Sequence, residues 1–264
     1  MAQKLPLVHA LGWIVASLFL VTGLTAHTCL YYREKDRAMR HDPGNHLTQI
    51  VQTGLQKEVL KTIYLAELVG LSIDRPTAYF DFDPKKAEAK LLKSPLIKQA
   101  KAMLLPPSTL AVDYTVRQPI ALLYDCENAA IDEEGRIFPV SPYLSPKNLP
   151  QLYLGLARVP ADWHTPIRGK KIDLALQILK LVSALPFRVA RIDVSKIDAP
   201  SLGTREIVLV ADQRFLRLST KNFPQELGNY LSLREQLKGQ EAKIIDFRIP
   251  NLAFLKEQKA TQAD

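Results

Sequence analysis

A long apolar segment opens the chain. No Asp, Glu, Lys or Arg occurs from Leu5 to Tyr32. Because about 20 apolar residues in a helix cross a bilayer, the pattern predicts a transmembrane helix over residues 11–32 after a short tail over residues 1–10. A cleaved signal peptide is the alternative, although the apolar run is long for one and no small-x-small cleavage site follows it. Aromatic residues of the type found at membrane interfaces are Trp13, Tyr31 and Tyr32.

Alternating patterns after a linker over residues 33–46 predict a small α+β domain over residues 47–118. The expected order is strand, helix, helix, strand, strand. In the first helix, one apolar stripe is formed by Val59, Ile63 and Ala66, and Asp83 is expected to be the N-cap of the second helix. The elements are strands over 47–53, 97–104 and 109–117, and helices over 56–69 and 84–92.

Residues 119–256 are predicted to form a β-rich domain with two helices, followed by a polar tail over 257–264. Short apolar runs separated by turns predict many short strands. The whole chain is therefore expected to be α+β, with a transmembrane helix at its N-terminal end. Expected helices cover 171–184, with Leu174, Ile178, Leu181 and Val182 on one face, and 223–237; expected strands cover 121–124, 129–131, 137–140, 188–194, 207–210, 215–218 and 243–249.

The charge pattern argues against nucleic acid as a partner. The formal net charge is +8 and the pI is near 9.4, but basic residues are interleaved with acidic ones, without the aromatic-and-basic stripe of single-strand binders. We expect a solvated basic surface near lipid. Lys4 alone precedes the apolar segment, whereas Arg33, Lys35, Arg37 and Arg40 follow it, so the positive-inside rule taken alone would place the C-terminal part inside.

Candidate chemistry is sparse. Cys29 and Cys126 lie far apart in the sequence and have no zinc-ligand spacing. His41 and His46 lie in the linker without a third ligand, and His164 stands alone. The motifs of serine hydrolases, zinc peptidases, penicillin-binding proteins and phosphate-binding loops are absent. We expect no catalytic, cofactor-binding or metal-binding residue, and therefore no enzyme.

Several short motifs follow one another in a set order. The stretch Pro107–Val112 leads into Val116–Ala121, and Ala130–Pro139 contains an Asp-Glu-Glu-Gly turn followed by an apolar strand. Together with three later stretches they resemble the FtsQ/DivIB family of bacterial cell-division proteins, over essentially the whole chain. The later stretches are Leu216–Ser219, Asn229–Arg234 and Ile245–Asn251.

The resemblance implies a POTRA domain over residues 47–118 and the family's β domain over residues 119–256, both outside the bacterial cytoplasmic membrane on a single-pass, type II anchor. It implies a non-enzymatic scaffold of the division complex that acts in septum formation. The implied partners are FtsB- and FtsL-like small coiled-coil membrane proteins. A POTRA-bearing export or envelope-assembly factor and a membrane-anchored cell-wall enzyme are the two alternatives.

The candidate partner site lies at the end of the β-rich domain. Alternation over 243–249 predicts that Ile245, Phe247 and Ile249 face the core and that Arg248 points to solvent. Pro250 fits an edge strand or a bend, because it lacks an N–H. Leu252 and Phe254 either bind a partner or close the core, and the resemblance favours binding of an FtsB-like protein. The candidate residues are Arg248, Ile249, Pro250, Asn251, Leu252, Ala253 and Phe254.

Overall fold

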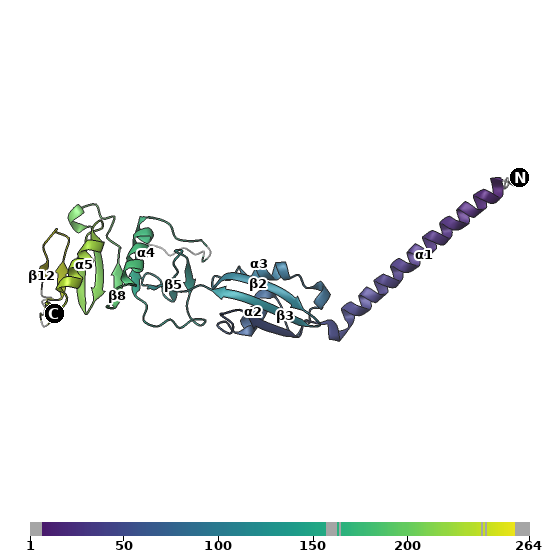
Figure 1. Cartoon of the computed structure of the whole chain (residues 1–264), viewed down its shortest axis with the longest axis horizontal. Helices are drawn as coiled ribbons and strands as arrows, with labels where there is room; N and C mark the ends of the chain where they lie inside the picture. The colour runs from purple at the N-terminus through teal and green to yellow at the C-terminus, as the bar shows by residue number, and fades with distance from the viewer. Residues whose placement is uncertain (1–6, 157–162, 164, 239, 241, 257–264) are drawn as a thin grey trace, which may run out of the picture. The chain divides into compact units, whose positions relative to one another are not determined.

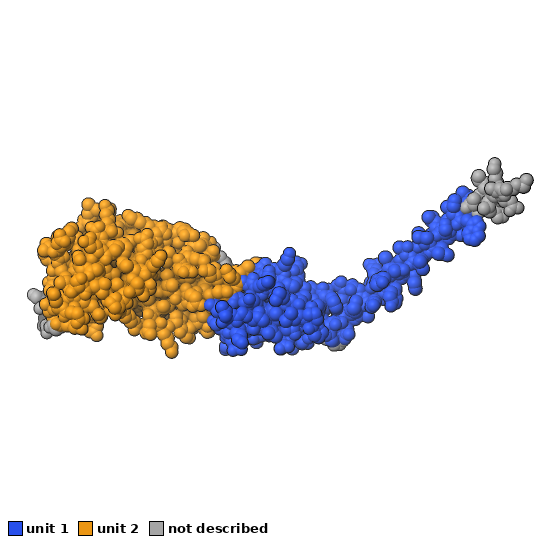
Figure 2. Space-filling view, viewed as in Figure 1, with its two compact units in different colours: residues 1–91, 100–114 blue, residues 92–99, 115–264 orange. Residues whose placement is uncertain are grey.

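The computed structural model describes residues 7–156, 163, 165–238, 240 and 242–256. The chain divides into two compact units, coloured separately in Figure 2. Unit 1 comprises Met1–Leu91 and Ala100–Tyr114, and unit 2 comprises Leu92–Gln99 and Thr115–Asp264. The fold is α+β, with an N-terminal apolar helix and a sheet-rich body (Figure 1). The sequence-based domain ranges 47–118 and 119–256 stay a prediction.

The N-terminal helix α1 spans Leu7–His41 (Figure 1). Its 35 residues correspond to about 52 Å at 1.5 Å per residue, which exceeds the apolar thickness of a bilayer, about 30 Å. The helix is long and apolar enough to span a membrane, and its side chains from residue 11 to residue 40 are exposed. Hydroxyl groups within it donate to carbonyls one turn back, as Thr22 does to Leu18 and Thr25 to Val21. Such bonds satisfy polar groups that would otherwise face lipid.

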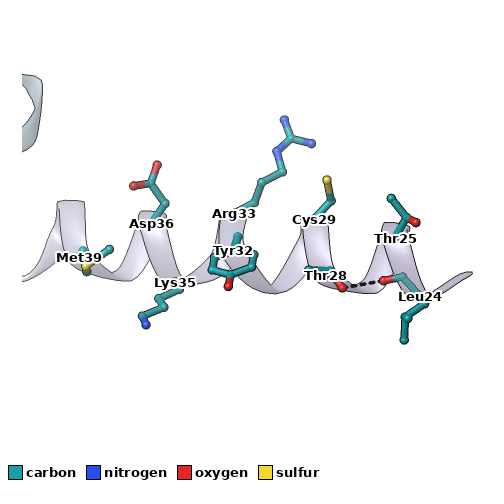
Figure 3. A pocket seen from close by; sticks show the side chains of 9 residues that line it. All are labelled: Leu24, Thr25, Thr28, Cys29, Tyr32, Arg33, Lys35, Asp36 and Met39. Carbon is teal, nitrogen blue, oxygen red and sulfur yellow. Dashed lines mark hydrogen bonds between the residues drawn. The ribbon is translucent and has the colours of Figure 1, made fainter. Parts of the chain in front are cut away.

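The predicted linker is helical over much of its length. Figure 3 shows α1 continuing without a break from Leu24 to its charged part, and Thr28 Oγ1 donates to the Leu24 carbonyl at 2.7 Å. Beyond Tyr32 the helix continues to His41, because the charged residues there suit a helix and form the (i, i+4) pair Asp36–Arg40, 3.1 Å apart. Residues 33–41 of the predicted linker therefore belong to α1, which ends at His41.

Unit 1 contains β1 Gln49–Thr53, α2 Thr62–Val69, α3 Pro84–Leu91, and most of β2 Ile97–Leu105 and β3 Thr109–Val116. In the described chain these strands form a three-stranded sheet in the order β1-β3-β2, with β1 parallel to β3. Asp83 caps α3 as predicted, because its Oδ1 accepts hydrogen bonds from the backbone N–H groups of Lys85 and Lys86. Asp81, the neighbouring carboxylate, pairs with Arg40.

The start and the buried face of α2 differ from the prediction. The helix begins at Thr62 rather than at residue 56, because Glu58 has a positive φ of 70° and the Leu60 N–H donates to the Tyr114 hydroxyl. Gln52 supports this turn, since its Oε1 accepts from the Glu58 N–H. The predicted stripe does not form the buried face, since Val59 and Ile63 are exposed and Ala66 is only half-buried. The buried apolar side chains of this segment are Leu60, Leu65 and Val69.

Unit 2 is built on a mixed sheet with helices α4 Lys170–Val182 and α5 Phe223–Leu233. Among the described residues the sheet has nine strands in the order β12-β11-β10-β9-β8-β7-β4-β5-β6. β7 is parallel to both β4 and β8, β10 is parallel to β11, and the remaining neighbours are antiparallel. The strands are β4 Ala121–Leu123, β5 Ala129–Ile131, β6 Ile137–Pro139, β7 Gln151–Tyr153, β8 Val189–Asp193, β9 Ile207–Ala211, β10 Arg214–Leu218, β11 Ile244–Asp246 and β12 Phe254–Lys256.

The two helices pack against one face of this sheet. In β9 the residues Ile207, Leu209 and Ala211 are buried and alternate with half-buried ones, so the covered face and the open face differ in exposure. The predicted stripe on α4 is partly wrong, since Leu174 and Leu181 lie at the edge of the core. The buried face of α4 consists of Ile172, Ala175, Ile178, Leu179 and Val182.

Candidate partner-binding edge

The C-terminal end of unit 2 forms one edge of the nine-stranded sheet. β11 pairs with β10 in parallel, and β12 folds back and pairs with β11 in antiparallel register. Among the residues that the structure describes, no strand pairs with the outer side of β12. This region contains the seven residues that the sequence predicts as the partner site.

The direction of the backbone groups at this edge follows from two hydrogen bonds. The Phe215 N–H donates to the Lys243 carbonyl, and the Phe247 N–H donates to the Arg217 carbonyl. Backbone groups of successive strand residues point to opposite sides. Since Lys243 and Phe247 face β10, Ile244 and Asp246 face β12, where they pair with Lys256 and Phe254. Leu255, between these two partners on β12, therefore turns its own N–H and C=O away from the sheet.

Apolar side chains accompany these outward-facing backbone groups. The exposed fraction of each residue's surface is 50% for Ile249, 54% for Leu252, 51% for Phe254 and 46% for Leu255. Exposed apolar side chains together on a sheet edge are typical of an interaction site. Leu252 and Phe254 therefore lie outside the core, and binding of a partner at these residues stays a prediction.

A tight turn connects the two strands. The Leu252 N–H donates to the Ile249 carbonyl at 3.2 Å, and Asn251 has a φ of 64°. Proline at the second position and Asn with positive φ at the third suit a type II turn. Pro250 and Asn251 therefore shape the return of the chain to β12, and both are exposed.

Arg248 is held by this unit rather than pointing freely to solvent, which corrects the sequence prediction. Its guanidinium donates from Nε to Asp246 Oδ1 at 2.9 Å, from Nη2 to Asp246 Oδ2 at 2.7 Å and from Nη1 to the Gly203 carbonyl at 2.7 Å. The carboxylate of the buried Glu206 lies 3.8 Å from Nη1. The Arg248 side chain is 21% exposed. The physical reason is the pair of carboxylates, which a bidentate guanidinium matches well.

The carboxylate of Asp246 also marks the end of β11. The Arg248 N–H donates to Asp246 Oδ1 at 3.1 Å, a turn in which the side chain replaces a ladder partner. The strand therefore ends at Asp246, whereas the sequence predicted an end at Ile249. Ile249 lies outside the core, and Ile245 and Phe247 are buried as predicted.

Electrostatics favour the charged pair. Burial works to raise the pKa of Asp246, but hydrogen bonds from the Arg248 guanidinium and backbone N–H outweigh it, and the pKa lies below its ordinary value of 3.8. Hydrogen bonding to Asp246 in turn raises the pKa of Arg248. Arg217 joins the cluster through Glu206 and Asp246, at 2.5 Å and 3.2 Å. The cluster thus connects β10, β11 and the loop before β9.

The structure divides the seven predicted residues by role. Ile249, Leu252, Ala253 and Phe254 are exposed at the edge, Pro250 and Asn251 make the turn, and Arg248 holds its base. Sequence reasoning did not assign Leu255, whose backbone faces outward, or Glu206, which lies 42 residues before Arg248 in the chain. Alternation alone does not distinguish Leu255 from its neighbours, because its outward direction follows from the pairing register of β12 with β11.

The other candidate positions form no reactive site in the described part of the chain. No group of three His, Cys, Asp or Glu residues that could hold a metal ion occurs among the described residues. Cys29 is exposed, Cys126 is half-buried, and both are free. His46 lies in an isolated bridge with Ala78. His164 lies outside the described residues.

Comparison with protein-family models and with curated proteins found no match to this chain.

Proposed function

We propose that the chain is a non-enzymatic scaffold of the bacterial division complex, of the FtsQ/DivIB type, which binds an FtsB-like partner by adding a partner strand to β12. The observation that carries this proposal is the β12 edge, where the Leu255 backbone faces away from β11 and exposed apolar side chains lie nearby in the chain. A partner strand would form hydrogen bonds with these backbone groups and bury the apolar side chains.

The remaining architecture supports this reading. A single N-terminal helix of membrane-spanning length suits a single-pass anchor. The order β1, α2, α3, β2, β3 supports a POTRA domain over residues 47–118, and the sheet of unit 2 supports the family's β domain over residues 119–256. An FtsL-like protein is proposed as a second partner in the same complex.

A single residue separates backbone from side-chain effects at the edge. Leu255→Pro removes the outward N–H, whereas Leu255→Val keeps both this donor and an apolar side chain. In nanodiscs, we expect the full-length Leu255→Pro protein to bind the extracytoplasmic segment of an FtsB-like partner about 100-fold more weakly than the parent, in line with loss of a central interface contact. Leu255→Val is expected to bind like the parent. Binding by Leu255→Pro that equals the parent's would remove β12 as the site.

The proposed orientation places everything after Tyr32 outside the cytoplasmic membrane of the bacterial cell, as a type II protein, although Arg33, Lys35, Arg37 and Arg40 follow the apolar segment. Long domains translocate largely regardless of such charges. Alkaline phosphatase fused after Pro119 or Asp264 is therefore expected to be active. Stable but inactive fusions at both positions would reverse the orientation and exclude the proposed function.

A further inference from the structure

An apolar groove lies beside α4 in unit 2, with a volume of about 910 Å³. It is lined by Leu176 and Leu179 of α4, by Ile120 before β4, and by Leu149 and Pro150 before β7. β12 is five strands away from β7 in the sheet, or about 24 Å at 4.8 Å per strand. The groove is therefore separate from the partner-binding edge.

The acidic side chains of the groove already have basic partners. Glu133 lies 3.3 Å from Lys98, and Glu134 lies 2.8 Å from Lys98 and 3.2 Å from Arg117. The hydrogen bond from Lys98 lowers the pKa of Glu134, and the hydrogen bonds to both glutamates raise the pKa of Lys98. These two acidic residues therefore leave little negative charge for a ligand.

The basic side chains of the groove are available. Lys180 and Arg188 line it, both are exposed, and among the described residues neither forms an ion pair. The C-terminal carbonyls of α4 carry about half a negative charge, which offsets only part of the positive charge of Lys180 and Arg188. The rim of the groove therefore has a net positive charge.

We propose that this groove docks an apolar segment of a partner protein that carries acidic residues facing Lys180 and Arg188. Complementary charge at the rim of an apolar groove steers and orients such a segment. The polar groups of Asn148, Gln177 and Ser183 also line the groove and suit a peptide backbone better than an acyl chain. A second copy of the chain fits less well, because its net charge is +8.

Two synthetic peptides test the proposal. They are 12-residue fluorescein-labelled probes with the same Leu positions and either Glu or Lys at all others, and anisotropy reports their binding to the full-length protein in phosphatidylcholine nanodiscs. The acidic probe is expected to bind at least tenfold more tightly than the basic one. The double variant Lys180→Glu/Arg188→Glu is expected to reverse this preference, whereas the control Lys57→Glu/Lys61→Glu in unit 1 and the edge variant Leu255→Pro are expected to keep it.

Four outcomes would overturn the proposal. The first is equal binding of both probes, and the second is an unchanged preference in a folded double variant. The third is displacement of the acidic probe by micromolar oleate, which would make the groove a lipid site. The fourth is concentration-dependent self-association blocked by the acidic probe, which would assign the groove to a second copy. If the charge reversal unfolds the protein, Lys180→Gln/Arg188→Gln replaces it, and an unchanged preference in that variant counts equally against the proposal.

Discussion

The two edges of the nine-stranded sheet are built in opposite ways. At β6 the side chains are covered, since Ile137 is 4% exposed and Phe138 is fully buried. At β12 the corresponding values are 51% for Phe254 and 46% for Leu255. Among the described residues neither edge has a further strand. The side chains are thus buried at the β6 edge and exposed at the β12 edge.

The backbone of β6 adds a second difference. The Val140 N–H donates to the Asn128 carbonyl, and the Asp132 N–H donates to the Arg136 carbonyl. By alternation, the outward-facing positions of β6 are Ile137 and Pro139, and proline has no N–H to offer. Edge strands with proline and covered side chains resist pairing with other chains. The contrast indicates that β12 lacks the protection that β6 has, as expected of an edge that receives a partner.

The largest expected effect comes from truncating the phenylalanine of each edge. Phe138→Ala should lower the free energy of unfolding by about 3–5 kcal/mol, because it empties a fully packed position. Phe254→Ala should change it by less than about 0.5 kcal/mol, as for other exposed positions, while weakening binding of the FtsB-like partner. Urea denaturation of both variants checks the comparison. Equal losses of stability would show that the two edges are packed alike.

The next effect concerns the base of the open edge. Arg248→Glu would place a third carboxylate beside Asp246 and Glu206, so we expect a loss of about 2 kcal/mol, within the range for breaking charged hydrogen bonds. The exposed control Lys256→Glu should cost less than about 0.5 kcal/mol. Thermal unfolding of both variants gives the comparison. An unchanged midpoint for Arg248→Glu would mean that the ion cluster does not stabilise the edge.

A weaker effect is expected from acid. Because the pKa of Asp246 is lowered in the folded protein, its pairing with Arg248 stabilises the fold fully above the ordinary pKa of 3.8 and is lost as the pH falls further. Between neutral and acid pH, the free energy of unfolding of Asp246→Asn should therefore decrease less than that of the parent. Circular dichroism between about pH 5 and pH 2, an interval that covers the usual titration range of carboxylates, measures this difference. Parallel curves for both proteins would exclude the effect.

The smallest effect is expected at the covered edge. Pro139→Val restores an outward N–H on β6, but the neighbouring side chains stay buried, so we expect the parent's assembly state and a stability within about 1 kcal/mol of the parent. Light scattering coupled to size-exclusion chromatography measures the assembly state. Dimerisation would show that proline alone protects this edge.

The sequence predicted those features that depend on neighbouring residues. The apolar run of α1, the Asp83 cap and the strands predicted over 207–210 and 215–218, which the structure has as β9 and β10, are examples. Features that depend on distant residues escaped prediction. The start of α2 is set by Tyr114, and β7 is too short to show any period in the sequence.

The candidate site shows the same division. The exposed apolar residues after Pro250 could be predicted because the chain pattern there no longer suits a core strand. The position of Arg248 could not, since it depends on Glu206 and on the Gly203 carbonyl, which lie on another loop. Contacts between segments far apart in sequence decide which side chains of a short strand are free.

Residue-resolved hydrogen exchange on the full-length protein, with and without the FtsB-like partner, tests most directly whether β12 receives a strand. The Leu255 amide, which faces outward, should exchange rapidly in the free protein and become protected in the complex. The Phe254 amide, which faces β11, should be protected in both states, and Ile137 at the opposite edge should not change. Unchanged exchange at Leu255 in a saturated complex would contradict strand addition at β12.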